Sequence, residues 1–246
     1  MMNRVLNRLI IVTAALTLVF GVCTWLLRDS RGNAEYYRGS NSVECCEYIE
    51  IDLLKTDVRL IPYSGDRIKF EYTSMVPITV MKGDNRIVIT ESDEFVLSFM
   101  TGDSSRFVLD LYLPREEYRS ITVYTSSGDV YMGGVRSGTV SVVTKSGSIT
   151  SENTRSAVKL VSGSGNILLD FDKVVAASSI ETRSGNADLI FPKGSSVALS
   201  YETETGIFRS ELISGSVRGS YMYSFNGGAE LIGADVGSGI MTVSEK

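Results

Sequence analysis

The chain of 246 residues contains no histidine. Histidine is the usual general base beside a serine or cysteine nucleophile, and it is the commonest side-chain ligand of transition metals. Its absence excludes Ser-His-Asp and Cys-His catalysis and removes most transition-metal sites. We therefore expect a protein that is not an enzyme and that carries no metal and no cofactor.

Runs of basic residues with interleaved aromatics are also missing, and the net charge is −5. Proteins that bind nucleic acid carry clustered Lys and Arg for the phosphates. The acidic balance therefore argues against a nucleic-acid partner. The charged fraction of 22% is that of a folded protein.

Cysteine is scarce, with three in the chain. Cys23 lies in an apolar segment, where a thiol behaves as a small hydrophobic group. Cys45 and Cys46 are adjacent, and three states are open to them: reduced and inert, joined in a strained vicinal disulfide, or bridged to a second chain. Two cysteines without histidine cannot complete a structural zinc site.

One long apolar run is present, near the N-terminus. Residues 9–27 carry no charge, and as a helix they would extend ~28 Å, close to the hydrocarbon thickness of a bilayer. A cleaved secretory signal is the alternative, because Gly21-Val22-Cys23 weakly matches a cleavage site. Cleavage there would leave Trp25-Leu26-Leu27 exposed at the new N-terminus, which favours a retained transmembrane helix.

The basic flank gives the orientation. Arg4 and Arg8 precede the apolar run, which favours an N-terminus inside the cell. We expect residues 1–8 to be a cytoplasmic tail and residues 28–44, which are polar and unpatterned, to be a tether. The rest of the chain would then be an extracytoplasmic domain of a single-pass protein of the cell membrane.

What the chain has in abundance is a short phrase of the type Thr-x-Ser-Gly, repeated along its C-terminal half. The glycines recur at intervals of about 20 residues, except that the last interval is longer, and a fixed period of this size is typical of stacked repeats. The glycines of the phrase are Gly128, Gly147, Gly165, Gly185, Gly206 and Gly239. We interpret them as structural turns, because glycine and its neighbouring hydroxyls suit a tight corner.

Short segments with alternating apolar residues flank each phrase, as in Ile121-Thr122-Val123 and Val158-Lys159-Leu160. Alternation with period two predicts half-buried strands. The turns could lie above one another in a β-helix or could close ordinary antiparallel hairpins. The near-constant period favours an all-β solenoid of stacked repeats over residues 119–246. Residues 45–118 also alternate but lack the phrase, so they are either degenerate rungs or a separate cap.

These features resemble the bacterial putative-adhesin β-strand-repeat family, a domain of unknown function. The resemblance rests on the apolar N-terminal segment, the alternating stretch from Ile49 to Asp66, the strand that ends in Leu113-Pro114, and the serial phrases. It implies a membrane-anchored β-helix, and it supplies no catalytic residues. The acidic residue after the turn glycine is kept here only at Asp129, which argues against a column of metal sites.

Three further groups are candidates for a role. Tyr221, Tyr223 and Phe225 alternate along one strand and so share a face, where they either form a binding platform or pack over the end of the stack. Asp170 and Asp172 also share a face, with Asp188 one repeat further on, and such carboxylates are what a β-helix enzyme acting on polysaccharide would need. A solvated strand face is the plainer interpretation. Asn166 and Asn186 share a phase and predict a structural amide ladder.

The sequence thus predicts a membrane-anchored β-solenoid that acts as an adhesin-like binding module or as an accessory module in envelope stress. Its expected partners are the membrane, through residues 9–27, and a cell-wall glycan or a neighbouring membrane protein. The alternatives are a carbohydrate-active β-helix enzyme and an envelope scaffold that assembles from copies of itself.

Overall fold

The computed structural model describes residues 36–92, 107–114, 117–210, 216–217 and 219–246. Contacts divide the chain into two units, one of Met1–Tyr36 with Val96–Ser104 and the other of Tyr37–Phe95 with Ser105–Lys246. Because Tyr36 is all that is described of the first unit, the fold below is that of the second.

The predicted tail (1–8) and transmembrane helix (9–27), together with most of the predicted tether, lie outside the described residues. In the part of the chain that is described, no helix is long and apolar enough to cross a membrane.

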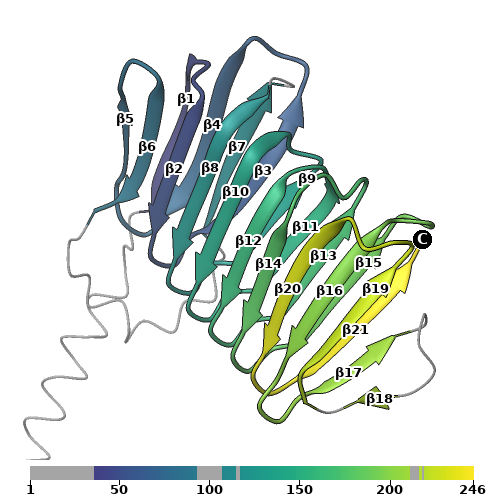
Figure 1. Ribbon diagram of the computed structural model, residues 1–246. Coiled ribbons are helices and arrows are strands. Elements are labelled where there is room, and N and C mark those ends of the chain that lie inside the picture. Colours follow the sequence, from purple (N-terminus) through teal and green to yellow (C-terminus); the bar gives the residue numbers. More distant parts are fainter. Residues whose placement is uncertain (1–35, 93–106, 115–116, 211–215, 218) are drawn as a thin grey trace, which may run out of the picture. The chain divides into compact units, whose positions relative to one another are not determined.

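All regular elements among the described residues are β-strands, which form two sheets (Figure 1). Sheet A has eleven strands in the order β1-β4-β7-β3-β9-β11-β13-β15-β21-β17-β18. Sheet B has ten in the order β19-β16-β20-β14-β12-β10-β8-β2-β6-β5. The inner strands of both sheets pair in parallel, whereas antiparallel pairs occur toward the ends. The expected all-β architecture is confirmed.

The repeating unit is a rung, in which a strand of sheet B leads through a tight turn into a strand of sheet A. Four rungs follow one another in sequence order: β8 (Tyr118–Thr125) with β9 (Val130–Gly133), β10 (Ser137–Thr144) with β11 (Ile149–Thr154), β12 (Ala157–Ser162) with β13 (Ile167–Phe171), and β14 (Ser178–Thr182) with β15 (Ala187–Phe191). Equivalent residues of successive rungs are in register, as Val140 is with Val158.

Alternation along the strands creates the core. In β10, Val140 and Val142 are buried between the sheets, while Ser141 and Val143 lie on the outer face. The same pattern in every rung produces one continuous apolar core of Val, Ile and Leu. Toward the C-terminal end the core becomes aromatic, and Phe171 stacks on Phe191 with ring centroids 5.5 Å apart. A single rung could not bury these side chains, so each depends on its neighbours.

The C-terminal rungs do not stack in sequence order. The rung β20 (Glu230–Val236) with β21 (Ile240–Glu245) lies between the β14/β15 rung and the rung β16 (Val197–Glu202) with β17 (Ile207–Ser210). The chain passes outward to form β16 and β17, and its last residues then return to fill the position left inside. Sheet edges at this end are β18 (Ser216–Val217) and β19 (Tyr221–Phe225).

At the N-terminal end, too, the rungs do not stack in sequence order. The rung β2 (Tyr48–Leu53) with β3 (Asp57–Tyr63) pairs with β8 and β9 on one side and with β6 (Arg86–Glu91) and β7 (Val108–Pro114) on the other. Outside these lie β5 (Ile78–Lys82) in sheet B and β4 (Arg67–Ser74) and β1 (Tyr37–Glu44) in sheet A. The region 45–118 therefore supplies both a rung and the cap.

The tether expected over residues 28–44 needs a correction. Residues 37–44 form β1, which pairs antiparallel with β4 along its whole length. The segment carries almost no apolar alternation because β1 is an edge strand whose side chains are mostly exposed, so backbone pairing rather than burial holds it.

A carboxylate completes the first turn of the stack. In later rungs, the amide groups of the turn donate to a carbonyl of the preceding turn, as Ser126 and Ser127 do to Leu54. The β2/β3 turn has Glu91 instead, whose carboxylate accepts hydrogen bonds from the amides of Leu54 and Lys55 and from the Thr56 hydroxyl. Glu91, the last residue of β6, thus provides for the β2/β3 turn the hydrogen-bond acceptors that a preceding turn provides for the later ones.

Candidate functional site on the outer face of sheet A

The phrase glycines form a column along one corner of the stack. A Cβ on Gly147 would lie 2.0 Å from the carbonyl oxygen of Gly128, and a Cβ on Gly185 would lie 2.0 Å from that of Gly165. The column continues through Gly239, over Gly185, to Gly206. Each turn is packed so closely on its neighbour that a side chain has no room, which gives these six glycines a structural role.

The hydroxyl groups of the phrase form hydrogen bonds within the same turns. The hydroxyl of Thr144 accepts a hydrogen bond from the amide of Gly147, and Ser162 and Thr182 do the same for the next two glycines. Ser162 and Thr182 also donate to the carbonyl of the preceding turn glycine. These side chains are buried and satisfied, so they are not available as nucleophiles.

A ladder of side-chain oxygens runs beside the glycine column. Each accepts the amide hydrogen of the equivalent residue in the next rung, and its members are Asp57, Asp129, Ser148, Asn166 and Asn186, with the amide of Ile240 at its end. The donor–acceptor distance is 2.8 Å from Asp129 to Asp57 and 2.9 Å from Asn186 to Asn166. We call this set the Asp57 ladder. It fixes two carboxylates, those of Asp57 and Asp129, at the edge of the outer face.

A second row crosses the outer face of sheet A parallel to the ladder. It contains one outward residue from each successive strand, and we call it the Tyr131 row: Asp110, Arg59, Tyr131, Thr150, Leu168, Asp188, Thr242 and Arg209. Because parallel strands keep their register, these positions recur at about 4.8 Å along the stack.

Tyr131 is the exposed aromatic residue of this row, with 38% of its surface accessible. A Cβ on Gly133 would meet the Tyr131 ring and hydroxyl at 2.8–3.3 Å, so the ring lies over the glycine two residues further along the strand. Its hydroxyl donates a hydrogen bond of 3.0 Å to Glu152. Partial burial, followed by the nearby Glu152 carboxylate, raises the pKa of Tyr131 above its usual value. The ring is thus held in place and remains neutral.

Arg59 and Asp110 form a bidentate pair next to Tyr131. The Nε–Oδ1 and Nη2–Oδ2 distances are 2.5 and 2.6 Å. The Asp110 carboxylate, as the main influence, raises the pKa of the guanidinium further. Arg59 is half exposed and Asp110 is mostly covered, so the pair presents a planar, nearly neutral set of donors to solvent.

Two more tyrosines continue the aromatic surface. The rings of Tyr63 and Tyr112 meet edge to face, with centroids 6.2 Å apart, and Lys69 Nζ lies 5.1 Å from the Tyr63 centroid. Burial, with the nearby Asp110 and Glu71, raises the pKa of Tyr112. Together Tyr63, Tyr112, Tyr131, Arg59 and Asp110 form what we call the tyrosine face.

Two shallow depressions lie on this part of sheet A. One, of about 330 Å³, is lined by side chains of both rows, with Asp57 and Asp129 on one side and Arg59, Tyr131 and Thr150 on the other. The second, of about 440 Å³, lies over β1, β4 and β7. Both include Val108 in their lining, so they adjoin, with the Arg59–Asp110 pair beside the junction.

The family model described as Toastrack DUF4097 matches residues 46–157 and 134–220, well over half of the chain. The chain belongs to the toastrack family. The resemblance to an adhesin-related domain of unknown function is thereby confirmed.

Among solved structures, the chain is similar to a "putative cell adhesion protein" from Clostridium sporogenes, which is 14% identical with a TM-score of 0.51 and matches over 86% of this chain and 100% of that one. A "putative adhesin" from Bacteroides fragilis is 13% identical with a TM-score of 0.46, over 87% and 98% of the two chains. A "putative lipid binding protein" from Parabacteroides distasonis is 10% identical with a TM-score of 0.36, over 87% and 98%. The first likeness shows the fold alone. A search of curated proteins finds no match.

The three carboxylates that the sequence offered as candidates for catalysis on polysaccharide do not lie together in one site. Asp170 pairs with Lys246 at 2.5 Å, and Asp172 pairs with Arg155. Asp188 lies beside Leu168 rather than beside Asp170. Within the described residues, no group of three or more Asp, Glu or Cys is placed to hold a metal ion.

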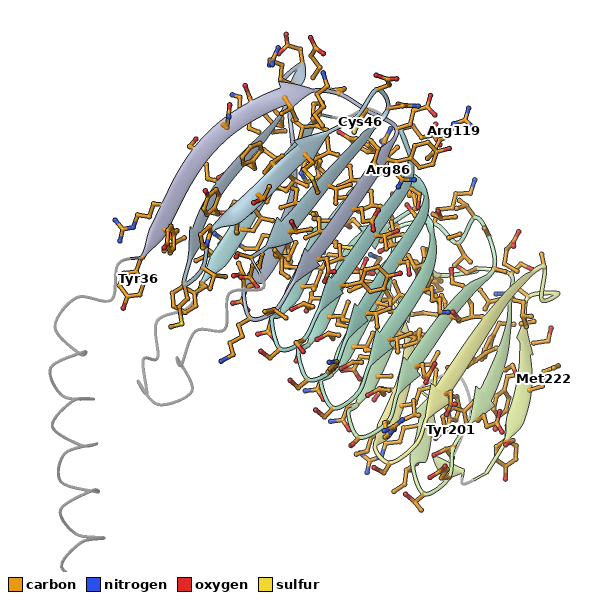
Figure 2. The ribbon with its side chains drawn as sticks, turned by 90° about the vertical axis from the view of Figure 1, so that its left-hand side faces the viewer. Tyr36, Cys46, Arg86, Arg119, Tyr201 and Met222 are labelled. Carbon is orange, nitrogen blue, oxygen red and sulfur yellow. The ribbon has the colours of Figure 1, made fainter. Side chains whose placement is uncertain are left out.

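Tyr221, Tyr223 and Phe225 share one face of β19, but that face is directed inward. They lie opposite the buried residues of β16, and the Tyr223 ring stacks on Phe208 with centroids 5.2 Å apart. Tyr223 and Phe225 pack against the core and Tyr221 is 38% exposed. The arrangement is therefore a cover over the last rung. The outward residues of this strand are Met222 and Ser224, and Met222 lies at the far end of the stack from Cys46 (Figure 2).

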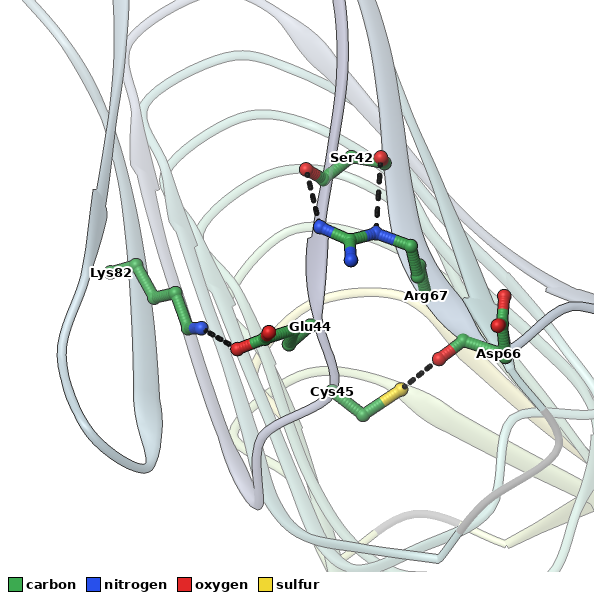
Figure 3. A network of polar contacts seen from close by, with 6 residues as sticks. All are labelled: Ser42, Glu44, Cys45, Asp66, Arg67 and Lys82. Carbon is green, nitrogen blue, oxygen red and sulfur yellow. Dashed lines mark hydrogen bonds and ion pairs between the residues drawn. The ribbon is translucent and has the colours of Figure 1, made fainter.

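Among the described residues, Cys45 and Cys46 form no disulfide with each other. Their sulfurs are directed to different carbonyls, that of Cys45 to Asp66 at 3.3 Å (Figure 3) and that of Cys46 to Tyr48 at 3.2 Å. Burial raises the pKa of Cys46, which makes its thiol less reactive. Figure 3 also shows Glu44 paired with Lys82, which joins the outermost strands of the two sheets.

Sequence reasoning missed the tyrosine face because its members come from different rungs. One signal was present: Thr56-Asp57-Val58 matches Gly128-Asp129-Val130 apart from the glycine. That alignment would have identified β3 as a strand of the stack and placed Arg59 beside Tyr131.

Proposed function

We propose that this toastrack protein is a membrane-anchored, extracytoplasmic β-solenoid that acts as an adhesin-like binding module. The observation that carries the proposal is the tyrosine face with its two adjoining depressions. It combines exposed aromatic surface with fixed polar groups, which are the features of a recognition site. The apolar segment 9–27 supports the anchor, and the description of the Clostridium sporogenes relative supports adhesion.

The same geometry favours binding over catalysis. The hydroxyls of the turns are consumed by structural hydrogen bonds, and Asp170 and Asp172 are each neutralised by a basic partner.

Accessibility of the stack in intact cells tests the topology. Cys23, Cys45 and Cys46 are replaced by serine in the full chain, and Lys145→Cys places one thiol on an exposed turn. We expect a membrane-impermeant maleimide to label this thiol in intact cells. The matched control, Asn3→Cys in the predicted tail, should react only after permeabilisation. The opposite pattern would overturn the proposed localisation.

Binding is tested separately by sedimentation. The full chain in detergent is mixed with washed cell envelopes from the expression host and from an unrelated bacterium, and the pelleted fraction is measured. We expect saturable retention by at least one envelope preparation. Retention by neither would count against an adhesin-like role.

A further inference from the structure

We propose that the tyrosine face binds a neutral polysaccharide, laid along the Tyr131 row with its axis parallel to the direction of stacking. This inference rests on the proposed binding function and specifies the ligand of the same site. It is argued from the aromatic ring, the polar groups, the charge and the periodicity of the surface.

The Tyr131 ring is suited to a pyranose. It lies over Gly133, where no side chain intervenes, and its hydroxyl is anchored to Glu152. A ring that lies along a sheet offers its face to solvent at little further cost in side-chain entropy. The apolar C–H face of a sugar ring packs on such a surface, as apolar groups do on aromatic faces generally.

The polar groups around the ring match hydroxyls. Asp57 and Asp129 bring acceptors at one side of the 330 Å³ depression, and Arg59 brings donors at the other, with the Thr150 hydroxyl able to do either. The charged groups are held before any ligand arrives: the two carboxylates by the Asp57 ladder, and the guanidinium by Asp110. Preorganised donors and acceptors bind hydroxyl groups with little further loss of side-chain conformational entropy.

Charge decides between classes of polymer. The depression contains two carboxylates, and its one cation, Arg59, is already paired with Asp110. An anionic polymer would be repelled by the carboxylates of Asp57 and Asp129, which disfavours uronic-acid and phosphate-linked chains. A neutral chain meets no such penalty.

The period of the stack supports a repeating ligand. Outward residues of the Tyr131 row recur at about 4.8 Å, which is close to the advance of an extended polysaccharide per sugar. The row continues from Tyr131 through Thr150 and Leu168 without a bulky charged side chain in between. Successive sugars can therefore contact successive rungs in similar ways.

The experiment measures binding of the full chain, in detergent, to soluble neutral polysaccharides (β-glucan, xylan, mannan) and to polygalacturonate as an anionic comparison. We expect at least one neutral polymer to bind and polygalacturonate to bind more weakly or not at all. Tyr131→Ala should weaken the neutral interaction by about tenfold or more, as the loss of an aromatic anchor does. Tyr131→Phe, which keeps the ring, should retain most of the affinity.

The matched control is Tyr124→Ala, because Tyr124 is 44% exposed on the outer face of sheet B; it should leave binding unchanged. Thr150→Arg fills the depression from an outward position, and it should abolish binding even if Tyr131→Ala fails to fold. Equal losses for Tyr124→Ala and Tyr131→Ala, or tighter binding of polygalacturonate than of every neutral polymer, would overturn the inference. If cell envelopes retain the chain but none of the neutral polymers binds it, the proposed ligand class is wrong and the proposed binding function stands.

Discussion

The carbonyl oxygen of Gly147 lies 1.9 Å from the position that a Cβ on Gly165 would occupy. A contact that short is impossible for real atoms, so the two turns can stack only because the second residue is glycine. The same relation holds from Gly128 to Gly147 and from Gly165 to Gly185. The periodic glycine is therefore a consequence of backbone packed directly on backbone.

Gly165→Ala tests this packing. The added methyl group must push apart two rungs that are tied together by β-ladder hydrogen bonds, and we expect a loss of about 3 kcal/mol or more in the free energy of unfolding. Gly233→Ala is the matched control, since Gly233 also lies in a strand of the stack and a Cβ there would meet nothing within 4 Å. Urea unfolding of both variants measures the difference. Similar stability for the two would contradict the role given to the column.

The Asp57 ladder leads to a second prediction. Asn186 accepts the amide hydrogen of Ile240 at 2.9 Å, and Ile240 belongs to the rung that arrives last in sequence. Asn186→Ala leaves that amide without its acceptor and should cost about 1 kcal/mol. Asn186→Asp keeps an oxygen at the same position and should recover most of the loss. The chemical-denaturation midpoints of the two variants provide the comparison, and equal midpoints would show that the ladder does not contribute.

Much of the fold could be predicted from the sequence because its signals are local. Alternation identified the strands, and the spacing of Gly128, Gly147, Gly165 and Gly185 indicated the stack. The position of the Gly239 rung could not be predicted in this way. Its phrase looks like its neighbours, and only long-range pairing of β20 with β14 and β16 places it before the Gly206 rung.

The candidate site was harder to predict for a related reason. Arg59, Asp110 and Tyr131 are each unremarkable in their own segments, and they become neighbours through the pairing of β3 with β7 and β9. The aromatic residues that are conspicuous in the sequence lie on β19, and the pairing of β19 with β16 directs them inward. Alternation reports that residues share a face, but it does not report which face is buried when a strand lies at the end of a stack.

The exchanged order of the rungs predicts an effect of truncation. Deleting residues 230–246 removes β20 and β21 from between the β14/β15 and β16/β17 rungs. We expect faster amide hydrogen exchange over residues 197–225, while residues 137–171 keep their protection. Lys246→Ala, which removes only the ion pair with Asp170, is the control and should change neither region. Unchanged exchange over 197–225 in the truncated chain would contradict the observed order.

Tyr201 predicts how stability depends on pH. Its side chain is 1% exposed, and its hydroxyl has no hydrogen-bond partner among the described residues. The neighbouring Thr203 hydroxyl accepts from the amide of Gly206 and donates to the carbonyl of Val236. Burial is the main cause that raises the pKa of Tyr201, and Thr203 offsets it in part.

The folded chain therefore keeps this phenol neutral at a pH where the unfolded chain ionises it. Ionisation of this phenol therefore does not affect stability below pH of about 10, the pKa of an unfolded tyrosine, and it lowers stability as the pH rises from there through the higher folded value. Tyr201→Phe removes both the buried hydroxyl and the ionisation. We expect this variant to be as stable as the wild type at pH 7 or up to about 1 kcal/mol more stable, and to lose less stability as the pH passes about 10. Urea unfolding across this range, with Tyr124→Phe as the exposed control, tests the prediction. A Tyr201→Phe variant that is clearly destabilised at pH 7 would show that the hydroxyl has a partner in the folded protein.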